Sequence, residues 1–234
     1  MILFLGAPGS GKGTQSSWLA SKLGMPCLST GDMLRAEAVR KTPAGRKLRR
    51  ILASGALAGD EVVCDAVKSR LERELPNGGL ILDGFPRTLK QAECLDSILR
   101  GLRMPQPTVL HLDVSLERLL KRLTARRHCA SCGAIYNVLT RPSSLGTRCE
   151  NDDGTLLQRE DDSEGVILRR LEAFDLSCAP LLDYYSHGDY HWIDGDRPAE
   201  VVSRELLSIL KPGKIKSRKT KSEKGESEKT QAAA

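Results

Sequence analysis

A glycine-rich stretch with a single lysine, near the start of the chain, has the residue types that bind phosphate. Residues 6–12 (GAPGSGK) follow the apolar run Ile2–Leu5, precede a segment with helical periodicity, and fit the pattern G-x-x-x-x-G-K. In this context glycines let backbone N–H groups point inward at a phosphate, a helix N-terminus adds partial positive charge, and the lysine reaches the β- and γ-phosphates. We therefore expect a nucleoside triphosphate to bind at Gly9, Ser10, Gly11, Lys12, Gly13 and Thr14.

The residue after the lysine departs from the usual phosphate-loop pattern. Gly13 stands where a serine or threonine usually contacts Mg²⁺, and Thr14 comes next. A chance glycine turn is the alternative interpretation. The required order of strand, loop, lysine and helix argues against chance.

Three cysteines and an aspartate have the spacing of a metal site. Cys129-x2-Cys132 and Cys149-x2-Asp152 are separated by 16 residues and form two knuckles that can share one tetrahedral ion. Three thiolates and a carboxylate suit Zn²⁺, and four protein ligands leave no open position, so we expect a structural ion that staples a small lobe. Free thiols in a loop are the alternative. His128 could compete with Asp152, although it adjoins Cys129 and reaches the site poorly.

The other cysteines and the apolar runs bear on the cellular compartment. Cys27, Cys64, Cys94 and Cys178 stand singly in helical or strand-like patterns, where a small core residue is expected. An odd total of seven argues against a disulfide framework. We find no apolar run near the ~18 residues of a membrane span and no signal peptide, so we expect a cytoplasmic protein.

The positive charge is concentrated at one end of the sequence. Residues 213–234 contain seven Lys or Arg and three Glu, which is +4 (7 − 3) of the total +6, so residues 1–212 carry about +2 (6 − 4). Ile215 is the only large apolar residue there, too little to offset the entropy of ordering the segment. We predict a disordered, solvated basic tail, with weak binding to RNA or anionic surfaces as the alternative.

Strand and helix patterns alternate along residues 1–212. Apolar runs at 2–5, 80–82, 109–112 and 190–193 are separated by helical periodicity at 12–23, 115–123, 166–174 and 199–210. This alternation predicts an α/β fold of the P-loop type, with a doubly wound parallel sheet of about five strands. Residues 29–58 and 126–162 interrupt it, so we expect two lobes on a core of 1–28, 59–125 and 163–212.

Three motifs in order resemble the adenylate kinase family. They are GAPGSGKGTQ at residues 6–15, STGDMLR at 29–35 and LDGFPRT at 82–88, and the resemblance extends from residue 1 to about 212. The cysteine-bearing segment is similar to the lid of the long, zinc-containing members, including the aspartate at the fourth position. The resemblance implies a monomer with a nucleoside-monophosphate lobe at 29–58 and a lid at 126–162.

The resemblance implies the reaction MgATP + AMP ⇌ MgADP + ADP. Its nucleophile is a phosphate oxygen of AMP that is already anionic at neutral pH, so no general base is needed. The obstacle is to hold two polyanions in line, and positioning and charge stabilisation should dominate. This chemistry predicts arginines and a lysine converging from several segments, with no His, Ser or Cys nucleophile.

Arginines occur at the positions that this chemistry requires. By resemblance Arg35, Arg87, Arg159 and Arg170 hold the AMP side, and Arg122 and Arg126 hold the ATP phosphates. We expect Arg122 and Arg126, four residues apart, to share one face of a helix. Guanidinium groups bind phosphate in bidentate fashion and stay protonated, although each arginine taken singly is more often a surface residue or part of a salt bridge.

The remaining assignments also come from the resemblance. Asp83 would help to hold hydrated Mg²⁺, with a structural cap on the next helix as the alternative. Thr30 and Gln91 match positions that recognise the adenine of AMP, and the usual Tyr-His pair of the lid is Tyr136-Asn137 here. The AMP pocket would also include Ala56, Leu57, Ala58, Gly84, Phe85 and Pro86. The ATP side would include Ile135, Tyr136 and Arg197.

Two other functions fit parts of the sequence. A kinase acting on UMP or CMP, or using GTP, would share the phosphate loop, but Thr30, Gln91 and the long lid favour AMP. A non-catalytic nucleotide-binding module that docks a partner through its basic tail would be expected to lack a phosphate-binding residue. None is missing among Lys12, Arg35, Arg87, Arg122, Arg126, Arg159 and Arg170.

Overall fold

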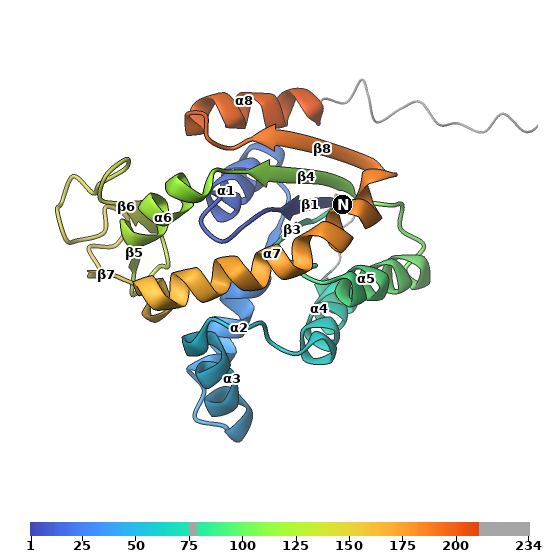
Figure 1. The fold of residues 1–234 in the computed structure, drawn as a ribbon, viewed down its shortest axis with the longest axis horizontal. Helices are drawn as coiled ribbons and strands as arrows, with labels where there is room; N and C mark the ends of the chain where they lie inside the picture. Colours follow the sequence, from blue (N-terminus) through green and yellow to red (C-terminus); the bar gives the residue numbers. More distant parts are fainter. Residues whose placement is uncertain (75–78, 211–234) are drawn as a thin grey trace, which may run out of the picture.

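The computed structural model describes residues 1–74 and 79–210, and the predicted basic tail at 213–234 lies outside them. A five-stranded parallel sheet lies at the centre, in the order β2-β3-β1-β4-β8 (Figure 1). Parallel order with helical crossovers confirms the predicted α/β fold class. The strands are β1 (Ile2–Leu5), β2 (Cys27–Ser29), β3 (Ile81–Asp83), β4 (Thr108–Asp113) and β8 (Asp189–Asp194).

Helices cover both faces of this sheet. In Figure 1, α1 and α8 lie on one side and α4, α5 and α7 on the other. The helices are α1 (Lys12–Leu23), α2 (Thr30–Ala38), α3 (Pro43–Ser54), α4 (Asp60–Glu74), α5 (Leu89–Gly101), α6 (Leu116–Thr124), α7 (Glu164–Ser186) and α8 (Ala199–Ile209). Within the described residues, no helix combines the length and the apolar composition that a membrane crossing requires.

The alternation of side chains along β1 explains why the sheet must be covered twice. Leu3 and Leu5 enter the apolar cluster on the α4, α5 and α7 side, while Ile2 and Phe4 enter the cluster on the α1 and α8 side. Successive side chains of a strand point to opposite faces, so a continuous apolar run needs a partner layer on each. The central strand therefore places the loop that follows it at the middle of the sheet's carboxyl edge.

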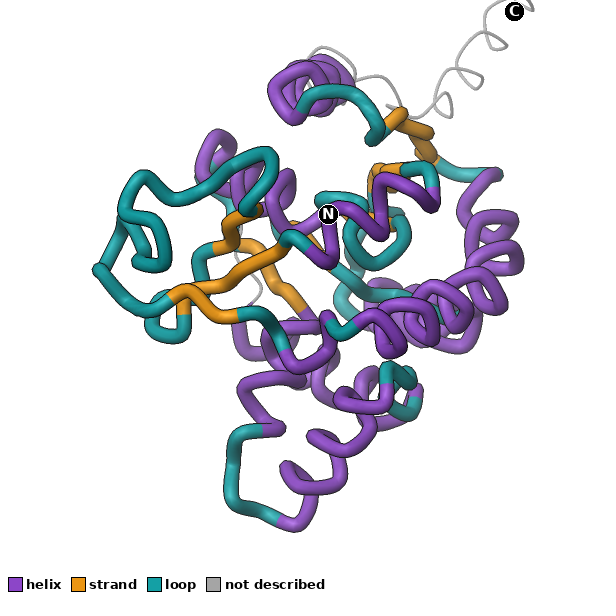
Figure 2. Tube along the Cα trace, turned by 60° about the vertical axis from the view of Figure 1, so that its left-hand side comes forward, coloured by secondary structure: helices purple, strands orange, loops and turns teal. Residues whose placement is uncertain are grey.

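Two segments project from the core. Residues 30–54 form α2 and α3, and α3 extends away from the sheet at the bottom of Figure 1. The other segment is mostly loop (Figure 2) around a three-stranded antiparallel sheet in the order β6-β5-β7. Its strands are β5 (Arg126–Cys129), β6 (Ile135–Asn137) and β7 (Leu156–Leu157), followed by the 3₁₀ turn η1 (Glu160–Asp162).

The helix predicted at residues 166–174 is much longer in the structure. Helix α7 continues through Pro180 to Ser186. A proline removes one backbone N–H and leaves the carbonyl four residues earlier without its usual partner. Pro180 and Leu176 are both exposed, and Leu176 is 80% exposed, so water can satisfy that carbonyl and the helix continues.

Candidate active site and candidate metal centre

The phosphate loop joins β1 to α1 at the carboxyl edge of the sheet. Gly6 has φ +138°, and a Cβ at this position would lie 2.3 Å from the backbone oxygen of Leu112. Only glycine fits such a close approach of two backbones. Gly11 precedes α1 with φ +98°, which turns the chain directly into the helix N-terminus.

Lys12 lies inside this loop. Its Nζ donates to the carbonyl oxygens of Gly6 at 2.7 Å and Ala7 at 2.8 Å. Burial lowers the pKa of Lys12 to about 7, the carboxylate of Asp83 opposes that shift, and the positive charge of Arg87 adds to it. A phosphate entering the loop would supply the anionic partner that the ammonium group needs.

Asp83 ends β3 next to Lys12. Burial raises the pKa of the Asp83 carboxyl, while Lys12 and Arg87 lower it. A Cβ on Gly13 would lie 3.3 Å from Oδ2 of Asp83, so a side chain at position 13 would crowd the carboxylate. This explains the glycine after the lysine. The N-cap of the next helix, α5, is Thr88, so the alternative role of Asp83 as a helix cap is wrong.

Three arginines from separate elements act electrostatically on Lys12 in the loop. The positive charges of Arg87, Arg170 and Arg126 lower the pKa of Lys12. The charges of Arg170 and Arg35 in turn lower the pKa of Arg87. Burial, reinforced by Arg170, lowers the pKa of Arg87 to about 10. Its Nε donates to the carbonyl of Gly84 at 2.8 Å, which aims the guanidinium at the strand ends. The cations predicted from distant motifs are therefore near enough to influence one another's pKa.

Arg126 does not share a helix with Arg122, so that expectation was wrong. Helix α6 ends at Thr124, and Arg126 begins β5, where it pairs in register with Asn137 of β6. The four-residue spacing is a local signal, and pairing with a distant strand overrides it. Arg126 instead donates Nε to Oδ2 of Asp162 at 2.7 Å and Nη2 to the other oxygen.

Two aspartates that the sequence analysis left without a role hold the arginines in place. The Asp162 side chain is fully buried, and Arg170 contacts it at 3.1 Å and Asp161 at 3.0 Å. The signal was visible in the sequence, because Glu160-Asp161-Asp162 follows Arg159 directly. In phosphate sites, carboxylates of this kind orient guanidinium groups before the ligand arrives.

Arg159 lies in the same positive field. Its Nε has no hydrogen-bond partner among the described residues. Burial lowers its pKa to about 10, and the charges of Arg35 and Arg126 contribute to the shift. Arg35 pairs with Asp32 at 2.5 Å. A buried donor without a partner, surrounded by other cations, is suited to an anionic ligand.

Arg122 and Arg197 bind backbone and carboxylate groups near the loop. Arg122 donates to the carbonyl oxygens of Ser10 at 3.1 Å and Gly195 at 2.8 Å, which ties α6 to the phosphate loop. Arg197 donates to the carbonyl of Asp194 at 3.1 Å and pairs with Glu205. Both side chains lie on the β4–β8 side of Lys12.

A pocket opens beside Arg87 between α2, α3, α4 and α5. It encloses about 310 Å³ of empty space, including its opening to solvent. Seven residues predicted for the AMP side line it, namely Thr30, Ala56, Leu57, Ala58, Gly84, Arg87 and Gln91. Leu34, Leu52 and Val63 complete the apolar wall and were missed, because an apolar residue on an amphipathic helix carries no ligand signal. Phe85 is instead buried in the core.

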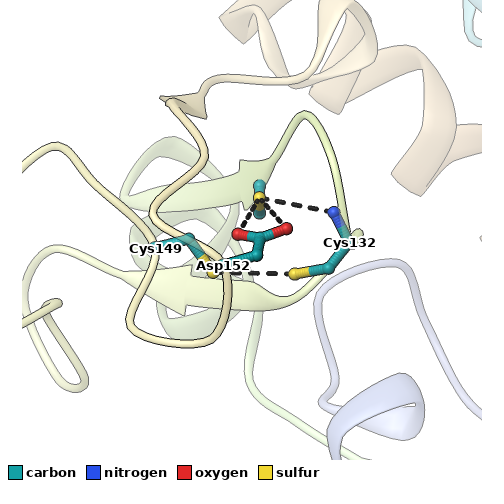
Figure 3. Close-up of side chains that lie close together, drawn as sticks. Cys132, Cys149 and Asp152 are labelled. Atoms are coloured by element: carbon teal, nitrogen blue, oxygen red, sulfur yellow. Dashed lines mark hydrogen bonds between the residues drawn. The ribbon is translucent and has the colours of Figure 1, made fainter.

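The four predicted metal ligands lie together at the edge of the small sheet. One ligand atom from each of Cys129, Cys132, Cys149 and Asp152 lies within 4.8 Å of the others. The Sγ atoms of Cys132 and Cys149 are 3.6 Å apart (Figure 3), and Cys129 Sγ is 3.2 Å from Oδ1 of Asp152. Tetrahedral coordination with Zn–S bonds of 2.3 Å separates two sulfurs by roughly 3.8 Å, so the set fits Zn²⁺.

Backbone groups around the cluster favour its charged ligands. The N–H groups of Ser131 and Asn151 donate to the sulfurs of Cys129 at 3.3 Å and Cys149 at 3.4 Å. The N–H of Gly154 donates to Asp152, and this bond is the main reason that the pKa of Asp152 is lowered to about 2. These bonds stabilise anionic ligands, which is what a cation requires.

Three other side chains in this segment make contacts of their own. His128 Nδ1 lies 3.0 Å from the carbonyl oxygen of Leu157, and His128 is not part of the ligand cluster. Tyr136 is buried, and its hydroxyl lies 3.4 Å from Cys149 Sγ. Asn137 donates to the backbone oxygen of Arg122 at 3.1 Å. A contact of Tyr136 with ATP would therefore come from its backbone.

Comparison with known proteins agrees with this geometry. Residues 4–190 match the family model described as adenylate kinase. The chain is 44% identical to the adenylate kinase of Thermodesulfovibrio yellowstonii, an alignment that covers 90% of this chain and 98% of that protein. It is 42% identical to the adenylate kinase of Archaeoglobus fulgidus, over 92% and 99% of the two chains. This protein is therefore a member of the adenylate kinase family.

Proposed function

We propose that this chain transfers a phosphoryl group reversibly from MgATP to AMP, the reaction of its family. The observation that carries the proposal is that the charges of Arg87, Arg126 and Arg170 all act on Lys12 of the phosphate loop. Arg87 also lines a pocket together with Thr30 and Gln91. Cations in a partly dry site stabilise the charge that develops on the transferred phosphoryl group.

The residue roles follow the resemblance to the adenylate kinase family. We assign the ATP phosphates to the loop, Lys12, Arg122 and Arg126, and the AMP phosphate to Arg35, Arg87, Arg159 and Arg170. Asp161 and Asp162 hold Arg126 and Arg170 in the free protein, so entering phosphates share or replace these carboxylates as partners. The attacking oxygen of AMP is already anionic, so no residue acts as a base.

Two metals accompany this function. Asp83 would hold Mg²⁺ through its water shell, and bound Mg²⁺ supplies positive charge at the β- and γ-phosphates. Cys129, Cys132, Cys149 and Asp152 would hold a structural Zn²⁺. Asp83 lies at the end of β3 in the central sheet, whereas the four zinc ligands lie in the small antiparallel sheet and its loops, so the two metals would bind in different parts of the fold.

We further propose that residues 29–58 and 126–162 act as lobes that close over the nucleotides and exclude water. Two contacts join α3 to the end of the lid and to α7, which follows it. Arg49 pairs with Glu160 at 2.9 Å, and Arg169 donates to the carbonyl of Ser54 at 2.8 Å. We also keep the predictions of a monomer and of a cytoplasmic location. The seven free cysteines agree with a reducing compartment.

A coupled assay with a panel of nucleoside mono- and triphosphates tests the proposal. We expect ADP to form from ATP plus AMP, with much lower rates for UMP and CMP. Faster turnover of a pyrimidine nucleotide would assign the chain to another acceptor. Tight ATP binding without turnover of any monophosphate would favour the non-catalytic module.

A further inference from the structure

The side-chain amide of Gln91 is held at both ends inside the pocket. Its Nε2 donates to Oδ1 of Asp60 at 2.8 Å, and its Oε1 accepts from the backbone N–H of Arg87 at 2.8 Å. Gln91 is only 2% exposed and lines the pocket beside Arg87. The amide therefore has little freedom to turn about its last torsion.

The chemistry of the two partners fixes which end of the amide points where. A carboxylate can only accept hydrogen bonds, and a backbone N–H can only donate. The NH₂ end of Gln91 must therefore face Asp60, and its oxygen must face Arg87. The reverse orientation would set two acceptors together at Asp60 and two donors together at Arg87.

Asp60 is itself held firmly. It is the first residue of α4, and the same Oδ1 also accepts from Oγ1 of Thr88 at 2.9 Å. Thr88 in turn accepts from the backbone N–H of Gln91 at 3.2 Å and is the N-cap of α5. The network joins the starts of two helices, and each of its hydrogen bonds has a defined donor and acceptor.

The fixed amide keeps one N–H and one oxygen lone pair for a ligand. Adenine presents a donor, its C6 amino group, next to an acceptor, N1. Hypoxanthine and guanine present the same two functions in reversed order, with O6 as acceptor and N1–H as donor. An amide free to turn by 180° could match either order, whereas a fixed amide matches only one.

We propose that Asp60 is a positioning residue that sets the base selectivity of the acceptor site by fixing the orientation of the Gln91 amide. The inference rests on the proposed function, in which AMP binds this pocket. Asp60 does not touch the nucleotide, and its effect passes through Gln91. With its amide fixed in this way, Gln91 favours a nucleotide with a 6-aminopurine base over one with a 6-oxopurine base.

The test compares kcat/KM for AMP and for IMP, which differs from AMP only at position 6 and N1. In Asp60→Ala we expect the AMP-to-IMP ratio to fall about tenfold, because one fixed hydrogen bond no longer opposes the turned amide. Asp60→Asn keeps an oxygen at the same place, so we expect it to retain most of the ratio. The KM for ATP should not change in either variant.

Glu61→Ala is the matched control, because it removes an exposed carboxylate from the same helical turn. Among the described residues, Glu61 has no hydrogen bond or ion pair to the network. If Asp60→Ala does not fold, Asp60→Ser replaces it, since serine suits a helix start but is too short to reach Gln91. A merely structural role would lower kcat/KM for AMP and IMP equally.

The outcomes separate this inference from the proposed function. Wild-type protein that does not phosphorylate AMP would refute the proposed function. Wild-type protein that is active with AMP, together with an unchanged AMP-to-IMP ratio in the Ala or Ser variant, would overturn the role of Asp60 alone. A fall of the ratio in the Glu61→Ala control would overturn it as well.

Discussion

Arg126 donates hydrogen bonds to both carboxylate oxygens of Asp162, a residue whose side chain has no exposed surface. The same carboxylate contacts Arg170 at 3.1 Å, so one buried anion holds two cations that we assign to different nucleotides. A buried charge is tolerated only when it is paired and hydrogen-bonded. In the proposed function, Asp162 therefore supplies negative charge to one arginine of each nucleotide site and links the two sites.

Asp162→Asn should destabilise the free protein more than the liganded protein. Without the carboxylate charge, Arg126 and Arg170 lose an anionic partner at about 15% exposure, and breaking such a pair costs about 3 kcal/mol. Phosphates of a bisubstrate analogue, two adenosines joined by five phosphates, can replace that partner. Thermal melting with and without the analogue measures the difference, and an equal loss in both states would refute this role.

ATP affinity should fall as the pH rises above 7. Lys12 has a pKa lowered to about 7 by burial, and only its protonated form attracts phosphate. Binding then requires proton uptake, so Kd should rise by up to about tenfold per pH unit above 7. Titration calorimetry between pH 7 and 9 measures it. Lys12→Arg stays charged and should show a flat profile.

The lowered pKa of Lys12 should also make the folded protein more stable as the pH rises, although ATP affinity falls. The folded pKa of about 7 lies below the ordinary value of 10.5, so the unfolded chain binds the additional proton between these values. The Lys12 contribution to the free energy of unfolding should therefore rise with pH from about 7 to 10.5. Denaturant melts of wild type and Lys12→Met across this window isolate it, and parallel curves would contradict the shift.

Lys12→Ala should lower kcat by at least about 10²-fold, because a phosphate charge is left unpaired in a dry site. The loop itself should persist, since its shape depends on glycines such as Gly6 and not on the lysine. Steady-state assays with ATP and AMP measure the loss, and a cooperative melting transition serves as the folding control. Near-normal turnover would remove Lys12 from the phosphate site.

Purified protein should contain about one zinc per chain, and chelation should lower its melting temperature. The cluster lies in a small sheet whose described core is limited to Cys129, Cys149, Tyr136 and their neighbours, so the ion would supply much of its cohesion. Cys149→Ser should reproduce the effect, whereas Cys178→Ser, outside the cluster, should not. Elemental analysis with calorimetry measures both, and a zinc-free sample with unchanged melting would exclude the site.

Removal of residues 213–234 should leave kcat/KM for ATP and AMP within about twofold of the intact chain, since the predicted active-site residues all precede this segment. The described fold already reaches Leu210, after the last helix. Assays of the truncated chain test this at matched ionic strength. A large loss of activity would give the basic tail a catalytic role.

Some elements could be predicted because their signals are local. The helix expected at residues 12–23 is α1 (Lys12–Leu23), since a glycine loop and a lysine mark its start. β2 was missed because three residues, Cys27–Ser29, give too short an apolar pattern. Arg126 was misplaced because its strand exists only through pairing with β6. Short strands and turns after helices depend on partners far away in the chain.

The sequence alone determined the chemistry: a phosphate loop, a set of arginines and a zinc-type ligand spacing can be read from residue types and intervals. Only the tertiary structure decided how these groups pair. It placed Asp162 between Arg126 and Arg170, and Asp60 against Gln91. Asp162 lies 36 positions from Arg126, and Asp60 lies 31 positions from Gln91. Packing of the helices around the sheet sets the distances between such residues. No local pattern encodes a distance of that kind.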